Sequence, residues 1–260
     1  MKLYLRLLGA SIRSRMQYKF DFLLTTIMYA MITALDFLTV AAILYRYQSV
    51  AGWSIYQVAL LSGLASASNG LFRVFGSELY DFERYMINGE YDNLLIRPWP
   101  PLLSLLSRNF DIGRVGGAIQ GYLVLGIGLT GVMAEGAPRW LIPYALLAPL
   151  AGGVIVGAIA MAVAGAGFYL TRINDLQTFA INAPLTAANY PAEIFPRWLQ
   201  GVLTALLPMA AIGYIPVRFA LGKGGSVLSL GAPVFAAVAA LLVALRIYQW
   251  GERHYQSTGS

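Results

Sequence analysis

Cysteine is absent from this sequence, and histidine occurs once, at position 254. A chain without cysteine has no thiol nucleophile, no disulfide and no thiolate ligand for a metal. Zinc sites and serine hydrolases need histidine among groups that converge inside a fold, whereas His254 lies in a polar C-terminal stretch. The sequence also contains no Gly-rich phosphate loop that ends in Lys-Ser or Lys-Thr. We therefore expect no catalytic residue, metal or cofactor in this chain.

Charge is scarce as well. Charged residues make up 12% of the 260 residues and apolar residues 58%, whereas a soluble domain carries about 25% charged residues. This composition is typical of a polytopic membrane protein. The net charge of +6 favours an anionic partner, but the basic residues are scattered or lie near the ends of apolar runs. We therefore expect contact with membrane lipid and not with nucleic acid.

Six apolar runs are long enough, or nearly so, to be read as membrane-spanning helices. We place them at Phe22–Tyr45, Ile55–Gly76, Ile112–Met133, Leu141–Leu170, Leu176–Tyr190 and Val227–Tyr248. The fifth run is too short to cross a membrane alone unless it begins inside the preceding turn. The predicted fold is an all-α membrane protein that forms one transmembrane domain over residues 1–260.

The basic residues predict how the helices are oriented. Residues 1–21 carry five of them around an apolar stripe at helical spacing; Lys2, Arg6 and Arg13 fall beside the stripe, whereas Arg15 and Lys19 intrude on it. This pattern predicts either an interfacial helix on the cytoplasmic leaflet or a simple basic anchor. With the N-terminus inside, thirteen of the 18 Lys and Arg residues fall on cytoplasmic faces or adjoining span ends, and five fall on outer faces. We therefore expect both termini in the cytoplasm.

One interval, which we call the charged segment (residues 78–111), holds six of the twelve acidic residues. Carboxylates are costly in lipid, so this segment must lie in water or at the membrane face. After Arg97 it contains Trp99 and three prolines, which predict a rigid, extended elbow. We interpret the segment as a docking surface, in which acidic groups set the register around apolar anchors. Its predicted docking residues are Asp81, Glu83, Tyr85, Met86, Glu90, Tyr91, Asp92 and Arg97.

Residues 191–225 are apolar but are interrupted by four prolines and by paired glycines. Two short helices that enter the outer leaflet and return would explain both features, because irregular backbone at that depth must be buried in protein or line a cavity. A seventh and an eighth span are the alternative, although the pieces between the prolines are short. Glu193 and Arg197 are four residues apart, which suits an ion pair on a helix surface.

Polar residues also occur inside two predicted spans. Ser62, Ser66, Asn69 and Arg73 recur at steps of four, three and four, which places them on one helical face. This stripe predicts a solute path or a bond to a neighbouring helix. Asp36 lies inside the first predicted span, where three interpretations stay open. In these interpretations Asp36 contacts a solute, pairs with the polar stripe, or lies protonated in a subunit interface.

Four stretches of the chain are typical of one transporter superfamily. They are Tyr91–Leu102, which contains the Leu-Ile-Arg-Pro elbow, Tyr190–Pro196, Leu207–Pro216 and Trp250–Ser257. The sequence resembles ABC transporter permeases of the exporter-type class-two superfamily, and within it a six-span subfamily whose substrates are mostly unassigned.

This resemblance implies a dimer of identical or related permeases in a bacterial-type plasma membrane. It also implies separate nucleotide-binding ATPase subunits, which hold the ATP and Mg. In that superfamily a coupling helix after the second span enters a groove on the ATPase, and re-entrant helices precede the last span. A membrane-embedded lipid-modifying enzyme and a non-transporting scaffold subunit are the alternative functions.

Overall fold

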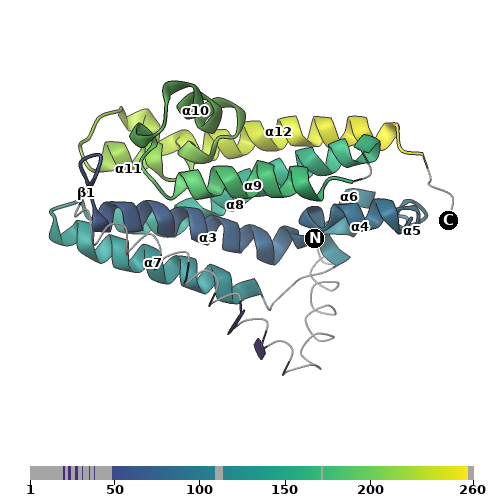
Figure 1. Cartoon of the computed structure of the whole chain (residues 1–260), viewed down its shortest axis with the longest axis horizontal. Coiled ribbons are helices and arrows are strands. Elements are labelled where there is room, and N and C mark those ends of the chain that lie inside the picture. The colour runs from purple at the N-terminus through teal and green to yellow at the C-terminus, as the bar shows by residue number, and fades with distance from the viewer. Residues whose placement is uncertain are drawn as a thin grey trace.

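Long helices run beside one another along the whole length of the computed structural model (Figure 1). They are α3 (Ile55–Tyr80), α7 (Val115–Ala134), α8 (Leu141–Leu170) and α12 (Ala232–Arg253). The structure describes residues 49–108, 114–170 and 172–256, together with isolated positions between 20 and 38. Within this part of the chain, four helices are long and apolar enough to cross a membrane. The expected all-α membrane protein is consistent with this architecture.

The number of spans differs from the six that the apolar runs predict. The run at Leu176–Tyr190 forms α9 (Asn174–Ala188), whose 15 residues are too few to cross alone. The first predicted span, with Asp36, and the N-terminal helix at residues 1–21 lie outside the described residues, apart from single positions. A bent helix pair at residues 197–220 raises the number of candidate spans to five if the pair crosses as one unit.

The start of α3 is fixed by a short ribbon and a capping box. Strands β1 (Ser49–Val50) and β2 (Trp53–Ser54) pair antiparallel across Ala51 and Gly52, which both have positive φ and so suit a two-residue hairpin turn. The Ser54 hydroxyl accepts a hydrogen bond of 3.3 Å from the Gln57 amide, and the Gln57 side chain accepts one of 3.3 Å from the Ser54 amide. These two bonds satisfy backbone donors that the first helical turn leaves unpaired.

Glycines bring α3 and α7 into backbone contact. A Cβ atom built on Gly63 or Gly70 of α3 would overlap the backbone of α7, and one built on Gly121 or Gly128 of α7 would overlap the backbone of α3. Such close approach gives dispersion contacts that lipid cannot replace. These two helices therefore form a tightly packed pair.

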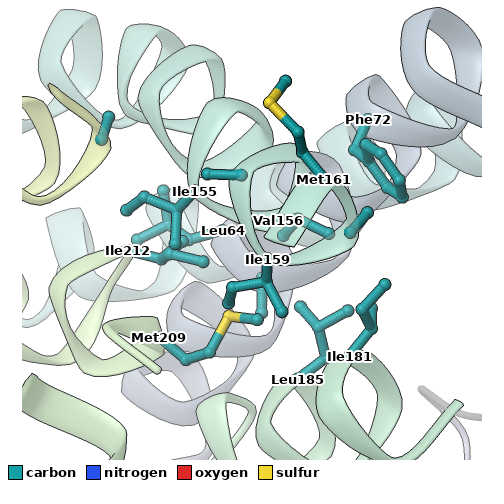
Figure 2. Packing of buried hydrophobic residues seen from close by; sticks show 14 of the residues in the cluster. Leu64, Phe72, Ile155, Val156, Ile159, Met161, Ile181, Leu185, Met209 and Ile212 are labelled. Carbon is teal, nitrogen blue, oxygen red and sulfur yellow. The ribbon is translucent and has the colours of Figure 1, made fainter. Parts of the chain in front are cut away.

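The centre of the bundle is built around α8. Its buried side chains pack against α3 on one side, and α9 and the short helix η4 (Met209–Ala211) lie nearby (Figure 2). The labelled members of this cluster are Leu64, Phe72, Ile155, Val156, Ile159, Met161, Ile181, Leu185, Met209 and Ile212. On its other side α8 packs along α12, where a Cβ atom on Gly251 would overlap the Gly165 carbonyl.

The proline-rich region before α12 folds as short pieces. They are η2 (Ala192–Ile194), α10 (Arg197–Gly201), the π-helix η3 (Val202–Leu206), η4, α11 (Tyr214–Ala220) and η5 (Val227–Gly231). The chain bends by 79° between residues 197–206 and 209–220. The predicted ion pair of Glu193 with Arg197 is wrong, because Pro196 separates their helices and Glu193 instead pairs with Arg218 at 3.8 Å. We call residues 197–220, which lie on both sides of the 79° bend, the bent pair.

Candidate functional site

The charged segment forms a cluster of short helices at one end of the bundle, which we call the charged end (Figure 1). They are α4 (Phe82–Ile87), α5 (Asp92–Leu95) and α6 (Pro101–Arg108). Gly89, with a φ of 65°, turns the chain between α4 and α5. Pro101 begins α6, where its missing N–H costs no hydrogen bond. Asp111 lies outside the described residues.

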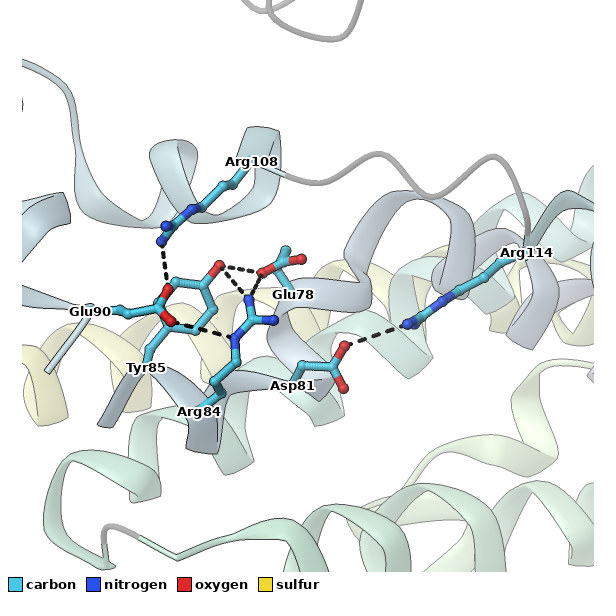
Figure 3. Close-up of polar contacts among 7 residues, drawn as sticks. All are labelled: Glu78, Asp81, Arg84, Tyr85, Glu90, Arg108 and Arg114. Carbon is cyan, nitrogen blue, oxygen red and sulfur yellow. Dashed lines mark hydrogen bonds and ion pairs between the residues drawn. The ribbon is translucent and has the colours of Figure 1, made fainter. Parts of the chain in front are cut away.

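A network of charges ties α3, α4 and α6 together (Figure 3). Glu78 is 2% exposed and accepts hydrogen bonds from the Tyr85 hydroxyl and, at 3.2 Å, from Arg84. Glu90 lies 3.9 Å from Arg84 and 3.2 Å from Arg108. Buried carboxylates are tolerated when donors surround them in this way. The segment is therefore a folded unit and not a simple linker.

A further ion pair joins the segment to α7. Asp81, at the junction of α3 and α4, lies 3.5 Å from the guanidinium of Arg114, which directly precedes α7. The same carboxylate borders a polar pocket of about 400 Å³ between α4 and the start of α9.

Glu83 closes the N-terminus of α9. Its Oε2 accepts hydrogen bonds of 2.6 Å from the backbone amides of both Ile173 and Asn174. The first amides of a helix have no partner within the helix and carry partial positive charge, which a carboxylate satisfies. One turn further on, Gln177 donates to the Leu79 carbonyl at 2.6 Å. Helix α9 is therefore bonded to both α3 and α4.

Tyr91 joins the segment to the last turns of α12. Its hydroxyl donates to Glu252 at 2.5 Å and lies 3.1 Å from the Tyr248 hydroxyl. Tyr255 donates to Asp92 at 3.0 Å. Burial, together with the neighbouring Tyr248 and Glu252, raises the pKa of Tyr91 well above its usual range. Burial and the bond to Asp92 raise the pKa of Tyr255 to about 12, so both hydroxyls stay protonated donors at neutral pH.

The polar stripe of α3 meets a second polar stripe on α9. Arg73 stacks over the Tyr80 ring at 3.9 Å from its centroid. The Tyr80 hydroxyl lies 3.5 Å from the Thr178 hydroxyl and accepts from Asn182 at 3.4 Å. We call Asn69, Arg73, Tyr80, Thr178 and Asn182 the polar seam.

The polar seam is only partly enclosed. Of the predicted stripe, Ser62 is buried, whereas Ser66, Asn69 and Arg73 are half-buried. The Oδ1 atom of Asn69 is buried and has no hydrogen-bond partner among the described residues. Within the same part of the chain, no three His, Asp or Glu side chains gather as they would around a metal ion.

A family model described as an ABC-2 family transporter protein matches residues 30–259. The chain belongs to this ABC-2 transporter family. None of the curated proteins compared with it matches. Membership confirms the resemblance given by the four motifs, and it makes the protein a membrane-spanning permease component of an ABC transporter. It also implies association with an ATPase subunit.

The structure corrects the apolar part of the docking surface predicted for this ABC-2 permease. Tyr85, Met86 and Tyr91 are 0%, 3% and 0% exposed. They cannot be exposed anchors for a partner, because they hold the charged segment onto the permease itself. Local sequence does not distinguish the two cases, since an aromatic residue in a charged stretch is compatible with either burial or docking.

All four of the predicted acidic docking residues have partners inside the permease. Asp81 pairs with Arg114, Glu83 caps α9, Glu90 pairs with Arg84 and Arg108, and Asp92 accepts from Tyr255. The side chains that do project are those of the elbow. Ile96, Trp99 and Leu95 are 83%, 53% and 45% exposed, and Arg97 is also exposed. We call Leu95, Ile96, Arg97 and Trp99 the elbow surface.

Two parts of the site were missed in the sequence. The α9 stripe could have been found, because Thr178, Asn182 and Thr186 follow one another at steps of four. The contact of Tyr91 with Glu252 could not, because 161 positions separate the two residues and no local pattern links them.

Proposed function

We propose that this protein is a permease subunit of an ATP-driven ABC exporter, which pairs with a second permease, identical or related, and binds separate ATPase subunits through the charged segment. The observation that carries the proposal is the construction of that segment. It is bonded to α3, α7, α9 and α12, yet it projects an apolar elbow. A loop that only connects two spans needs no such bonds. An element that passes the movement of a partner on to several helices does need them.

The elbow surface supports docking to a groove of defined chemistry. Leu95, Ile96 and Trp99 offer apolar area, and buried apolar anchors dominate the affinity of most interfaces. Arg97 gives the elbow surface a net positive charge, because the nearby carboxylates are already paired with other groups of the same chain. The groove that fits is therefore apolar with an acidic rim, and the ion pair across that rim would set orientation more than affinity.

The polar seam supports the solute path. Polar groups at the depth of a membrane are stable only beside other polar groups, water or a neighbouring subunit. The exposed Thr178 and the unpaired Oδ1 of Asn69 leave that requirement partly unmet within one chain. A second permease facing the seam would enclose it and form a path between the two copies. We propose that Ser66 and Asp36 also face this space, whereas Ser62 is buried within the chain and does not.

We propose that the charged end is cytoplasmic and that the bent pair is a re-entrant element at the outer face. The excess of basic residues at the charged end and near both termini supports this orientation. Single cysteines at Leu206 and Gly222 test it, because the chain has no cysteine of its own. A membrane-impermeant maleimide applied outside should label position 222 and spare position 206. Labelling of position 222 only from the cytoplasm would refute the orientation.

Affinity purification tests the docking. The double variant Ile96→Ala/Trp99→Ala, carried on a tagged chain in its native membranes, should lose the co-purifying ATPase. Truncating such anchors costs about 2 kcal/mol or more, which weakens binding about thirtyfold. Trp198→Ala is the matched control, because Trp198 is 70% exposed but lies on α10 in the bent pair. Equal recovery of the ATPase with the double variant and with the control would reject the elbow surface as the docking site.

A further inference from the structure

The C-terminal stretch Trp250–Ser257 has so far no role in the proposed function. Its first residues form the last turn of α12, which lies against the charged segment. Tyr91, a residue of the charged segment, is fully buried where that segment meets the last turn of α12. Its ring packs edge-on against Phe82 at 5.8 Å, Phe168 at 5.0 Å and Tyr255 at 5.1 Å. The elbow is thus anchored by one aromatic side chain set among α4, α8 and the C-terminal residues.

The hydroxyl of Tyr91 completes a directed hydrogen-bond chain. A tyrosine has one proton to give, and Tyr91 gives it to the Glu252 carboxylate at 2.5 Å. The Tyr248 hydroxyl, 3.1 Å away, must then donate to the Tyr91 oxygen. Bonds to a carboxylate are among the stronger protein hydrogen bonds. Two successive turns of α12 are therefore bonded to one residue of the charged segment.

Helix α12 is suited to carry a displacement to the other end of the bundle. Its 22 residues span about 33 Å as a continuous helix. It lies in backbone contact with α8 at Gly165 and Gly251. At its far end it continues from η5, where the Leu230 carbonyl accepts a bond of 2.9 Å from Tyr144. Residues 221–226 join the bent pair to η5, and α11 of that pair also packs against η5, so α12 connects the elbow with the bent pair.

Helix α3 is less suited to the same task. It is interrupted at Gly76, whose φ of −126° and ψ of 16° are not helical. This break lies between the polar seam residue Arg73 and the charged segment. A kink interrupts the backbone hydrogen-bond ladder and lets the two parts of a helix tilt independently. Motion of the elbow is therefore partly absorbed in α3 before it reaches the membrane-spanning part.

We propose that Tyr91, Tyr248 and Glu252 form a latch through which the charged segment moves α12, so that displacement of the elbow reaches the bent pair along α12 and not along α3. The three are positioning residues and contact no solute. This proposal rests on the proposed function, because an ATPase docked on the elbow supplies the displacement. Removing the latch uncouples the two ends of the permease and leaves the docking surface in place.

Two single-cysteine reporters separate the two routes. Leu228→Cys lies in η5 before α12, where Leu228 is 86% exposed, and Ala51→Cys lies in the turn before α3, where Ala51 is exposed. Each is unique because the chain has no native cysteine. The purified permease–ATPase complex is labelled with an impermeant maleimide, without nucleotide and with MgATP plus vanadate. At each position, the ratio of the labelling rates in these two conditions measures how far that position responds to the ATPase.

The latch is tested with Tyr91→Phe, Glu252→Gln and the double variant. Tyr91→Phe keeps the buried ring, and Glu252→Gln keeps an acceptor, so both retain packing. The control is Tyr122→Phe, which removes a hydroxyl bonded to the Leu146 carbonyl, away from the charged segment. A bond to a charged group shifts an equilibrium by about tenfold or more. We expect Tyr91→Phe to abolish the nucleotide response at position 228, Glu252→Gln to reduce it, and the control to leave it unchanged.

The outcomes distinguish the latch from the proposed function. The latch is supported if the parent complex responds strongly at position 228 and little at position 51, and if the variants retain the ATPase but lose the response at position 228, with the double variant no worse than Tyr91→Phe. A response at position 228 that survives Tyr91→Phe, or that is missing from the parent complex, overturns it. Loss of the ATPase from the variants alone shows that these residues only support the elbow, which also overturns the latch. If no ATPase co-purifies with the unmodified chain, the proposed function itself fails.

Discussion

The two sides of α3 contact their neighbours in different ways, through the backbone toward α7 and through polar side chains toward α9. Toward α7 the helix shows Gly63 and Gly70, and the two backbones touch. Toward α9 it shows the polar seam, where the hydrogen bonds of the Tyr80 hydroxyl are long, at 3.4 and 3.5 Å, and the side chains are only partly buried. Near the charged end, by contrast, a short bond joins the two helices, from Gln177 to the Leu79 carbonyl at 2.6 Å. Two helix backbones in direct contact allow only one arrangement of the pair, whereas polar side chains can exchange one hydrogen-bond partner for another or for water. The difference indicates that α3 and α7 form one rigid unit, whereas α9 is held firmly at its first turn and more weakly along the polar seam.

The largest effect is expected from breaking the side that faces α7. Gly121→Leu places a side chain where even a Cβ atom overlaps the backbone of Ala67. Overpacking of this kind costs about 3 kcal/mol when the neighbours are backbone and cannot yield. The variant should fail to give monodisperse protein on size-exclusion chromatography in detergent.

Gly126→Leu is the control for that variant. It makes the same change on the same helix, at a position where a Cβ atom meets nothing within 4 Å. It should behave like the unmodified chain. If both variants are equally stable, α3 and α7 are not locked by backbone contact, and the contrast between the two sides of α3 is wrong.

A smaller effect is expected from releasing α9. Glu83→Ala removes the carboxylate that accepts from the Ile173 and Asn174 amides. Loss of a helix cap costs about 1 kcal/mol. Hydrogen exchange at the first turn of α9 should therefore speed up, while exchange within α3 and α7 should stay as it was. Glu193→Gln, which alters an exposed carboxylate paired with Arg218, should leave α9 unaffected. Unchanged exchange in α9 would show that Glu83 does not hold it.

The smallest effect is expected within the polar seam itself. Tyr80→Phe removes both hydroxyl contacts with α9 and keeps the ring beneath Arg73. Because these bonds are long and partly exposed, their loss should cost less than about 1 kcal/mol. The melting temperature in detergent should fall by only a few degrees. A loss as large as that of Gly121→Leu would mean that the polar side is as rigid as the glycine side.

Much of the fold follows directly from residue type. A backbone in lipid must satisfy its own hydrogen bonds, so the long apolar runs predict helices, and the run at Leu141–Leu170 coincides with α8. Proline removes a helical hydrogen bond, and the bend at Leu207 and Pro208 lies in the proline-rich region that was expected to break into short helices. Pro149 and Pro184, by contrast, lie inside α8 and α9. The four family motifs likewise identified the ABC-2 permease before any contact was known.

The sequence could not determine which side chains the charged segment presents. Its density of charge predicted a docking surface with Tyr85, Met86 and Tyr91 as apolar anchors, and the side chains that are exposed are different ones. Tyr85 and Tyr91 are buried, and Ile96 and Trp99 project. Both arrangements place the same residues in the same short helices, so local pattern does not distinguish them.

That choice depends on distant partners, which only the tertiary structure brings together. Glu83 is an ordinary acidic residue of α4 until α9 places two unpaired amides beside it, 90 and 91 positions further along the chain. Tyr91 is buried because α8 and α12 supply a pocket of aromatic rings and a carboxylate acceptor. Local sequence therefore determined the helices of this permease, because each helix satisfies its own backbone. The pairing of charges and hydroxyls was decided by the packing of those helices, because each bond needs a partner from another part of the chain.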